Sequence, residues 1–569
     1  MRWLAVLVAT LLAIGAASAS PRCPPGDENF PRFGNDPALF RGAIDKVTGF
    51  EPTAQKLTGI VVPHHLLADR LVALGFRAAS AHSYRRIVIL SPDHFRRTAK
   101  MFATSARGYE TEFGPVEADA EAVRQLRVNA PGLIEESCLF DKEHGVRALL
   151  PFVRHYFPGA KVVPVAMSVK SKRADWDALL AALLPIVTDD TLVVESTDFS
   201  HYLPQPVARR FDQQTLNVLA SGNLDMIAAL RQPDHADSVG ALYVQTALQR
   251  RRFAAQPLVI ANESSNTFAE RPMEETTSYN VVLFGAAGPD FDSAAAPGSE
   301  VYYLAGDTNF GRAMKMALLD PDAAEKVRQA ILAVTRGRPL IVNLEGVILP
   351  NVPAGLDGLT LAMPEDVTLR WLKALNVVAV SLANNHANDL GASGLAETAR
   401  ALDAAGIRHF GQGETLSLPR LDVVGLTDLD SNGAVQTRLI SDDLLGRLAR
   451  PDPGKAVLAM VHWGREYVAE PSPREVGLAD SMRLAGAAAI VGGHPHVAST
   501  GVAALAGGDT AVVYSLGNFL FDQTAAKASG QLVEVRVFPQ GTLYLRAVPI
   551  PNLFDLAARR QQPPASSGR

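Results

Sequence analysis

Residues 457–464 read Val-Leu-Ala-Met-Val-His-Trp-Gly, a run of five apolar residues that leads directly into a histidine. A short apolar run of this kind is typical of a buried strand, and the polar residue that follows it lies at an edge of the sheet. Similar units recur along the second half of the chain. The other polar motifs that follow apolar runs are Gly-Asp-Thr-Asn at 306–309, Asn-Leu-Glu at 343–345, Asn-Asn-His at 384–386 and Gly-His-Pro-His at 493–496. Because ligands bind outside the carboxyl ends of strands in open α/β sheets, these motifs predict one shared site.

The five motifs carry the donor types that a pair of divalent cations requires, namely carboxylates, carboxamides and imidazoles. The candidate metal ligands are Asp307, Asn309, Glu345, Asn385, His462, His494 and His496. Glu345 has two oxygens that could bridge two cations, and paired cations about 3.5–4 Å apart activate water and stabilise a departing oxyanion. His386 is the candidate general acid, since an imidazole titrates near neutral pH. The pattern predicts a dinuclear hydrolytic site and does not distinguish Mn, Zn, Fe or Mg.

The length and charge of the chain limit its function class. With 569 residues, the chain is too long for one core and should form more than one domain. Its formal net charge of −5 gives no electrostatic case for a nucleic-acid partner.

The first residues have the pattern of a secretory signal. Arg2 precedes an apolar stretch at 4–15, and Ala17-Ser18-Ala19 offers a cleavage site, so we expect residues 1–19 to be removed. No later segment has transmembrane length, so we expect a periplasmic or secreted protein without an integral membrane segment after cleavage. The two cysteines, Cys23 and Cys138, could pair there or stay apart.

Apolar runs alternate with helix-like stretches in both halves, which predicts two α/β domains with largely parallel sheets. We expect domains over 50–287 and 300–552. A Pro- and Gly-rich linker over 288–299 joins them, and a disordered tail covers 561–569.

Polar residues also follow the predicted strands of the first half. They include Pro-His-His at 63–65, Ser-Pro-Asp-His at 91–94, Glu-His at 143–144 and Ser-Thr-Asp-Phe-Ser-His at 196–201. Three or four imidazoles and a carboxylate that meet at one sheet edge could hold a single metal ion with open positions. The residues of this second pocket are His64, His94, His144, Asp198 and His201.

Several segments of the second half resemble the CapA family. They are Ser-Leu-Ala-Asn-Asn-His-Ala-Asn-Asp at 381–389, His-Trp-Gly-Arg-Glu-Tyr at 462–467, Gly-Gly-His-Pro-His-Val at 492–497 and Tyr-Ser-Leu-Gly-Asn-Phe at 514–519. The resemblance covers roughly Glu300 to Pro551. It implies a role in poly-gamma-glutamate or capsule synthesis and a fold similar to calcineurin-like metallophosphoesterases, an α/β sandwich.

The same resemblance implies a division of ligands between the two metals. One metal would take Asp307, Glu345 and His496, with Asn309 as an extra ligand; the other would take Glu345, Asn385, His462 and His494. Asn309 stands where typical phosphoesterases have a histidine, and Glu345 where they have an aspartate.

The first half, from about Thr58 to Gly285, resembles the Memo family, which is related in fold to class III extradiol dioxygenases. The resemblance includes Ser-Thr-Asp-Phe-Ser-His-Tyr at 196–202 and implies His64, His94 and His201 around a single iron or copper, with Asp198 beside them. The family usually adds a cysteine before a glycine, but residues 237–240 read Asp-Ser-Val-Gly here. Val239 cannot bind a metal, so copper or iron binding should weaken unless His144 or Asp198 compensates.

The sequence thus favours a fusion of a Memo-like domain with a CapA-like domain. The leading hypothesis is a secreted, metal-dependent hydrolase of phosphoesterase type that acts on an anionic polymer or phosphoester in capsule, poly-gamma-glutamate or envelope-polymer metabolism. One alternative is a non-catalytic factor that binds polymer and works with envelope polymer-export machinery. Another is a Memo-like protein that handles oxygen or copper.

Overall fold

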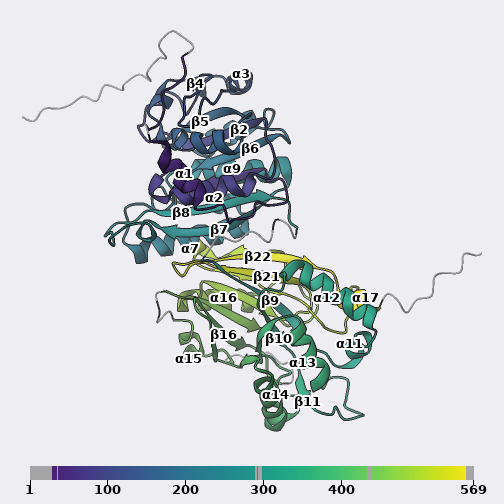
Figure 1. Cartoon of the computed structure of the whole chain (residues 1–569). Helices are drawn as coiled ribbons and strands as arrows, with labels where there is room; N and C mark the ends of the chain where they lie inside the picture. Colours follow the sequence, from purple (N-terminus) through teal and green to yellow (C-terminus); the bar gives the residue numbers. More distant parts are fainter. Residues whose placement is uncertain are drawn as a thin grey trace, which may run out of the picture.

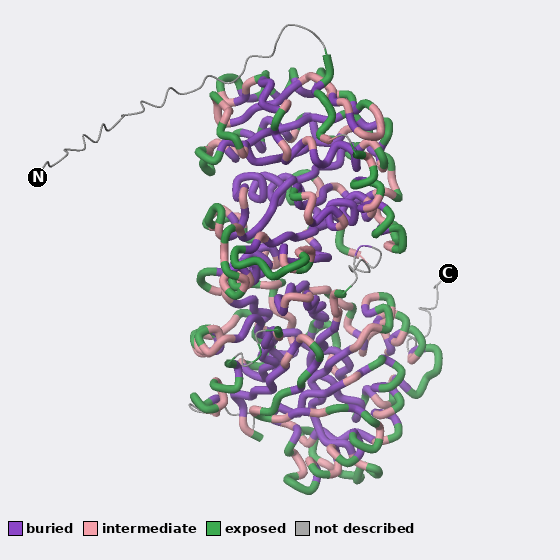
Figure 2. The backbone as a smooth tube through the Cα atoms, turned by 60° about the vertical axis from the view of Figure 1, so that its left-hand side comes forward, coloured by how far each residue is buried: buried purple, intermediate pink, exposed green. Residues whose placement is uncertain are grey.

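The computed structural model describes residues 28–558, apart from 35, 289–290, 292–297, 432–438, 450–451 and 453. Within these residues the chain forms two α/β domains, as the sequence predicted (Figure 1). Buried residues fill the interior of each domain (Figure 2). The predicted signal at 1–19, the tail at 561–569, Cys23 and most of the predicted linker lie outside the described residues.

The N-terminal domain is built on an eight-stranded sheet of order β4-β3-β5-β2-β6-β1-β8-β7. The strands are β1 (Gly59–Val62), β2 (Arg86–Pro92), β3 (Phe102–Thr104), β4 (Ile134–Glu136), β5 (Lys161–Met167), β6 (Thr191–Ser196), β7 (Gln256–Ser264) and β8 (Ser278–Gly285). The central strands β5, β2, β6 and β1 are parallel, and β8 adds to β1 antiparallel. The carboxyl ends of β1, β2 and β6 therefore meet at one edge.

Helices cover both faces of this sheet. A Cβ on Gly59 would touch Gln245 and Gln249 of α9, whereas Val62, on the other face, touches Gly75 of α2. The helices are α1 (Pro37–Asp45), η1 (Leu66–Ala68), α2 (Asp69–Ala79), α3 (Ala120–Asn129), η2 (Leu139–Asp141), α4 (His144–Arg147), α5 (Leu150–Tyr156), α6 (Arg173–Leu183), α7 (Gln205–Ser221), α8 (Leu224–Ala228), α9 (Val239–Phe253) and η3 (Ser265–Thr267).

The C-terminal domain contains two six-stranded sheets and a small two-stranded one. The first sheet has the order β14-β13-β10-β9-β21-β22, the second β15-β16-β17-β18-β20-β19, and β11 pairs with β12. The strands are β9 (Glu300–Thr308), β10 (Leu340–Leu344), β11 (Val347–Leu349), β12 (Ala362–Pro364), β13 (Val377–Ser381), β14 (Arg408–Phe410), β15 (Thr415–Ser417), β16 (Leu421–Thr427), β17 (Ala456–His462), β18 (Ala489–Gly493), β19 (Ala503–Ala504), β20 (Ala511–Val513), β21 (Gly530–Val537) and β22 (Leu543–Ile550).

The two large sheets pack face to face, since one apolar cluster contains Leu304 and Ile341 from the first sheet and Leu458 and Val491 from the second. Further apolar clusters lie between each sheet and its outer helices, which completes an α/β sandwich. The helices are α11 (Arg312–Ala317), α12 (Pro321–Thr335), α13 (Glu365–Ala374), α14 (Gly391–Ala405), α15 (Asp442–Gly446), α16 (Pro473–Ala485), η4 (Ala506–Gly508) and α17 (Leu553–Ala558).

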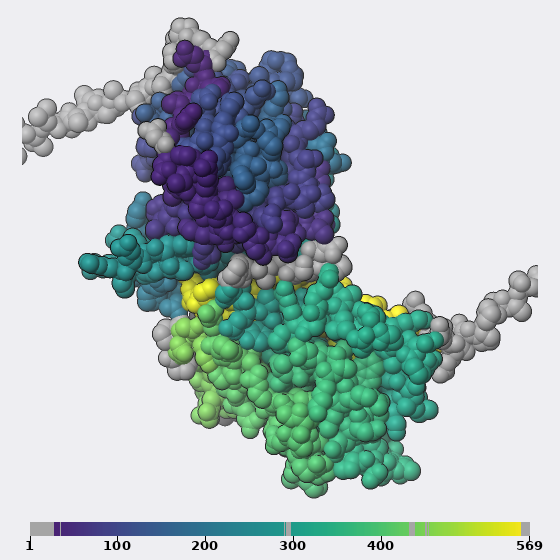
Figure 3. All heavy atoms as spheres, in the orientation of Figure 1, coloured from purple at the N-terminus to yellow at the C-terminus, as the bar shows by residue number. Residues whose placement is uncertain are grey.

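The domains are joined through α7 and the β21–β22 hairpin, whose yellow residues lie at the junction in Figure 3. The Gln213 carboxamide donates to the carbonyl of Leu543 at 2.8 Å and accepts from its N–H at 2.9 Å. Phe538 and Tyr544 belong to the same apolar cluster as the N-terminal strands. None of the helices that the structure describes is long and apolar enough to span a membrane.

Candidate metal centres

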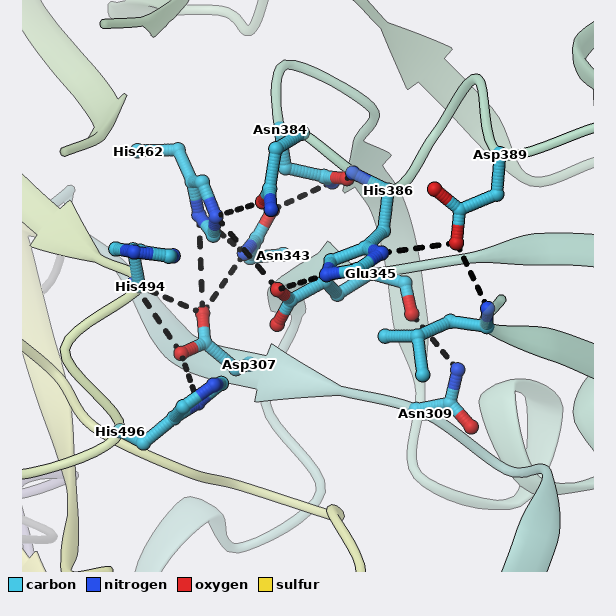
Figure 4. A network of polar contacts seen from close by, with 12 residues as sticks. Asp307, Asn309, Asn343, Glu345, Asn384, His386, Asp389, His462, His494 and His496 are labelled. Carbon is cyan, nitrogen blue, oxygen red and sulfur yellow. Dashed lines mark hydrogen bonds and ion pairs between the residues drawn. The ribbon is translucent and has the colours of Figure 1, made fainter. Parts of the chain in front are cut away.

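The five polar motifs of the second half meet at the carboxyl ends of β9, β10, β13, β17 and β18 (Figure 4). Strand register explains the meeting. Asn343 pairs with Asp307 across β10 and β9 and with Ser381 across β10 and β13, while His462 pairs with Gly493 across β17 and β18. Parallel strands therefore bring segments together that are far apart in the sequence.

Asp307 and His496 form one side of this site. The Asp307 carboxylate lies 3.1 Å from His496 Nδ1 and accepts a hydrogen bond from Asn343 Nδ2 at 2.8 Å. The backbone N–H of His494 also points to both Asp307 oxygens, at 3.3 and 3.2 Å. The Asn518 oxygen is 2.8 Å from His496 Nδ1 and orients that ring.

His462 forms the other side. Its Nε2 lies 2.7 Å from the Asn385 oxygen and 3.6 Å from Glu345 Oε1. Its Nδ1 lies 3.1 Å from Asn343 Nδ2, which can only donate, so Nδ1 accepts this hydrogen bond. The His494 ring is 4.9 Å from the His462 ring.

Glu345 is common to both sides. Donor atoms of Asp307, Glu345 and His496 all lie within 4.8 Å of one another, and so do those of Glu345, His462 and His494. Glu345 is 1% exposed, yet neither of its oxygens accepts a hydrogen bond from the residues that the structure describes. Nor does His494 Nδ1, also buried, find a partner among them. Buried polar atoms without partners are costly, and metal coordination would satisfy them.

The protonation states follow from burial and close contacts. Burial, together with the charge of Asp307, raises the pKa of Glu345 to about 8. Burial and the nearby His496 lower the pKa of His494 to about 4, which leaves its imidazole neutral at pH 7. Burial opposes the charge of His496, but its hydrogen bond to Asp307 and the charge of Glu345 raise its pKa to about 9. At pH 7 the Glu345 carboxyl and the His496 imidazolium thus carry protons that a cation would displace.

Asn309 occupies a different position from the other predicted ligands. Its Nδ2 donates to the Glu345 carbonyl at 2.7 Å, and its Oδ1 accepts from the Gly311 N–H at 2.8 Å. The side chain therefore fixes the backbone around Glu345, and both of its polar atoms are already used.

His386 stands at the rim of the site beside Asp389. Its Nδ1 is 2.8 Å from Asp389 Oδ2, and its Nε2 is 3.9 Å from Glu345 Oε1. Burial lowers the pKa of His386, but Asp389 and Glu345 outweigh this effect and raise it above the ordinary value. A protonated imidazole held in this way suits proton donation. Sequence reasoning missed Asp389, although its spacing of three residues from His386 is a usable signal.

The loop that follows β18 has an unusual backbone at the two histidines of the site. His494 and His496 have positive φ values of 95° and 59°, a conformation that residues other than glycine seldom adopt. A Cβ at Gly493 would lie 3.0 Å from Asp307 Oδ1, so any other residue there would push this carboxylate out of its position.

The N-terminal domain holds a second histidine cluster. His64, His94 and His144, three of the five predicted residues, have donor atoms within 4.8 Å of one another. Asp198 Oδ1 accepts from the His64 backbone N–H at 3.1 Å, and its Oδ2 is 3.7 Å from His64 Nε2. His201 does not belong to this group of donor atoms among the described residues, and its Nδ1 contacts the carbonyl oxygen of Phe199.

Two acidic residues that were not among the predicted site residues take part in this cluster. Glu143 Oε1 is 2.6 Å from His94 Nδ1, and Asp237 Oδ2 is 3.2 Å from His64 Nε2. Burial opposes the charge of His94, but hydrogen bonds with Asp237 and Glu143 raise its pKa to about 10. Asp237 could have been suspected, since it lies in the short segment where the cysteine is missing.

Comparisons with known proteins agree with both resemblances. Residues 32–267 match the family described as Memo-like protein, and residues 302–423 and 435–523 match the family described as bacterial capsule synthesis protein PGA_cap.

Three curated relatives illustrate the match. Capsule biosynthesis protein CapA of Bacillus anthracis is 35% identical over 211 residues, 33% of this chain and 50% of that protein. PGA biosynthesis protein CapA of Bacillus subtilis is 30% identical over 204 residues, 32% of this chain and 53% of that protein. A MEMO1 family protein of Caldivirga maquilingensis is 25% identical over 169 residues, 28% of this chain and 59% of that protein. The chain thus spans only 50 to 59% of the length of these relatives.

Proposed function

We propose that the C-terminal domain, which matches the PGA_cap family, is a dinuclear metal-dependent hydrolase that cleaves phosphoesters. We place its action in capsule, poly-gamma-glutamate or envelope-polymer metabolism. The descriptions of the PGA_cap family and of the two CapA relatives support the polymer part of this proposal.

The observation that carries the hydrolase part is the position of Glu345. Its two buried oxygens lack hydrogen-bond partners among the described residues, and it belongs to both groups of metal-binding side chains. A carboxylate placed in this way can bridge two cations. Imidazoles and carboxylates around it suit borderline divalent ions such as zinc, manganese or ferrous iron.

The two cations would activate water and stabilise the charge that develops on the departing oxygen. The residues of the chain do the rest. Asp307, Glu345 and three histidines would hold the ions, and Asn343 fixes two of these side chains by donating to Asp307 and to His462. His386, oriented by Asp389, donates the proton that the leaving group needs.

The protein acts outside the cytoplasm in this proposal. The signal-like pattern at 1–19 supports it. So does Cys138, which is part of a disulfide, a bond that persists in oxidising compartments.

The proposal is tested by metal content and turnover of the full chain. In a His94→Ala background, which removes a histidine of the N-terminal cluster, elemental analysis after loading with Mn²⁺ or Zn²⁺ should find about two ions per chain. Bis(p-nitrophenyl) phosphate should be hydrolysed. His462→Ala and His494→Ala should each lose metal and at least ~100-fold in turnover. His409→Ala, a partly exposed histidine on β14, is the matched control and should change neither.

Full metal content and turnover in both site variants would refute the assignment of the site. Metal binding and poly-gamma-glutamate binding without any turnover would instead favour the non-catalytic polymer-binding factor. Unfolding temperatures of the metal-free proteins that match the metal-free parent show that the variants are folded.

A further inference from the structure

The second histidine cluster, at the sheet edge of the N-terminal domain, is completed by a carboxylate from a distant segment. His64 follows β1, His94 follows β2 and His144 begins α4, whereas Asp237 lies just before α9. His64 and Asp237 are buried or nearly so, with side-chain exposures of 3% and 11%, and His94 is 21% exposed. The cluster is therefore largely shielded from solvent at His64 and Asp237 and more open at His94.

The donor atoms lie at the distances that one ion would impose. His64 Nε2 is 3.0 Å from His94 Nε2, and Asp237 Oδ2 is 3.2 Å from the first and 3.6 Å from the second. Four ligands at about 2.0–2.1 Å in a tetrahedral arrangement lie about 3.3 Å from one another. The triangle of two nitrogens and one oxygen matches this spacing. His144 has a donor atom within 4.8 Å of donor atoms of His64 and His94 and is the candidate for the fourth ligand.

The remaining ring nitrogens are held by other groups, as is usual for histidines that bind metals. His94 Nδ1 contacts Glu143 Oε1 at 2.6 Å, and His64 Nδ1 contacts Ser196 Oγ at 3.2 Å. Glu143 is itself fixed by the backbone N–H groups of His94 and Gly145, at 3.1 and 2.9 Å. Both Nε2 atoms consequently face the same point.

Of the two aspartates nearby, Asp237 fits this point better. Asp198 Oδ1 accepts a hydrogen bond from the His64 backbone N–H, and its other oxygen lies 3.7 Å from His64 Nε2. Among the described residues, no ion pair joins Asp198 to His94. Asp237 reaches the Nε2 atoms of both His64 and His94. Its Oδ1 is buried and has no hydrogen-bond partner among the residues that the structure describes.

We propose that Asp237 is the anionic ligand of a mononuclear metal centre formed with His64, His94 and His144. A carboxylate with three imidazoles suits a divalent cation of borderline hardness, such as zinc or ferrous iron, whereas cuprous copper prefers thiolates. Asp237 thus adapts the N-terminal domain to a harder cation, in a sequence where Val239 offers no thiolate. This assignment does not depend on the C-terminal site.

Spectroscopy of a ligand exchange tests the proposal directly. In Asp237→Cys a thiolate replaces the carboxylate, and addition of Co²⁺ to the full chain should produce a sulfur-to-cobalt charge-transfer band in the near ultraviolet. Wild-type protein should show none, because Cys138 is disulfide-bonded. The C-terminal site does not interfere, because its metal-binding side chains are carboxylates and imidazoles. The Asp237→Cys chain should also gain affinity for Cu⁺, measured by competition with a copper chelator.

A pair of conservative variants provides the second measurement. Each variant removes a negative charge but keeps an oxygen that can accept the existing backbone hydrogen bond. In the wild-type chain Asp237 accepts from the Asp198 N–H at 3.3 Å, and Asp198 accepts from the His64 N–H at 3.1 Å. Asp237→Asn should bind Zn²⁺ at this centre about 100-fold more weakly than wild type, and Asp198→Asn should stay within about 10-fold. A charge-transfer band in Asp198→Cys but not in Asp237→Cys would overturn the proposal, as would unchanged Zn²⁺ affinity in Asp237→Asn.

Discussion

Metal loading of the C-terminal site at pH 7 should release about two protons per chain. A ligand must lose its proton before it binds a cation, so groups that are protonated in the metal-free protein contribute to the release. With a pKa of about 8, Glu345 is roughly 90% protonated at pH 7, and His496, with a pKa of about 9, is almost fully so. His494 contributes almost nothing, since its pKa of about 4 leaves it neutral.

Removal of these protons opposes binding. At 1.36 kcal/mol per pH unit, displacing one proton from each group at pH 7 costs about 4 kcal/mol in total. The apparent affinity for metal therefore rises as the pH rises through the pKa of Glu345, and it levels off above the pKa of His496. At pH 9 the release should fall below about one proton per chain.

Calorimetric titration with Zn²⁺ in buffers of different ionisation enthalpy measures the release. The titration uses a His94→Ala chain as the parent, because loss of this histidine disrupts the N-terminal cluster and leaves the C-terminal site to bind the zinc. Glu345→Gln should release about one proton fewer. If no protons are released at pH 7, or if Glu345→Gln releases as many as the parent, the cations do not meet these side chains and the reasoning fails.

Three further outcomes follow from the structure. His386→Gln should lower kcat by about 10²–10⁴-fold without loss of metal, as measured by turnover and elemental analysis; lost metal would make it a ligand instead. Gly493→Ala should weaken metal binding because its Cβ would lie 3.0 Å from Asp307 Oδ1, whereas Gly477→Ala in α16, with no atom within 4 Å, should raise stability by up to about 1 kcal/mol. Equal metal content in the two alanine variants would contradict this. Gln213→Ala removes two hydrogen bonds to the β22 backbone and should cost about 1–3 kcal/mol in urea unfolding; a change below about 0.5 kcal/mol would show that the contact between domains is dispensable.

The motifs at the strand ends could be predicted from the sequence because each one depends on only a few neighbouring residues. An apolar run that ends in Asp307, Glu345 or His462 marks both the strand and the edge where its polar residue emerges. The limits of α14 (Gly391–Ala405) are also marked locally, since a glycine follows its last residue and no proline interrupts it. Parallel order then brings such ends together without further information.

The direction of individual side chains was not readable in this way. Asn309 is two residues from Asp307, yet it turns to the backbone around Glu345, and His201 turns to a carbonyl two residues before it. Asp237 reaches the N-terminal cluster from the segment before α9, far along the chain from the three histidines. Where a side chain points depends on backbone dihedrals and on partners that are distant in the sequence.

The sequence by itself therefore determined the two α/β domains, the strand ends and most of the candidate donors, because periodicity and residue type are local properties. Only the folded chain selected which donors face one another. That selection depends on strand register, on positive φ values at His494 and His496, and on buried oxygens of Glu345 and Asp237 that find no partner among the described residues. These features arise from contacts between segments that lie far apart along the chain.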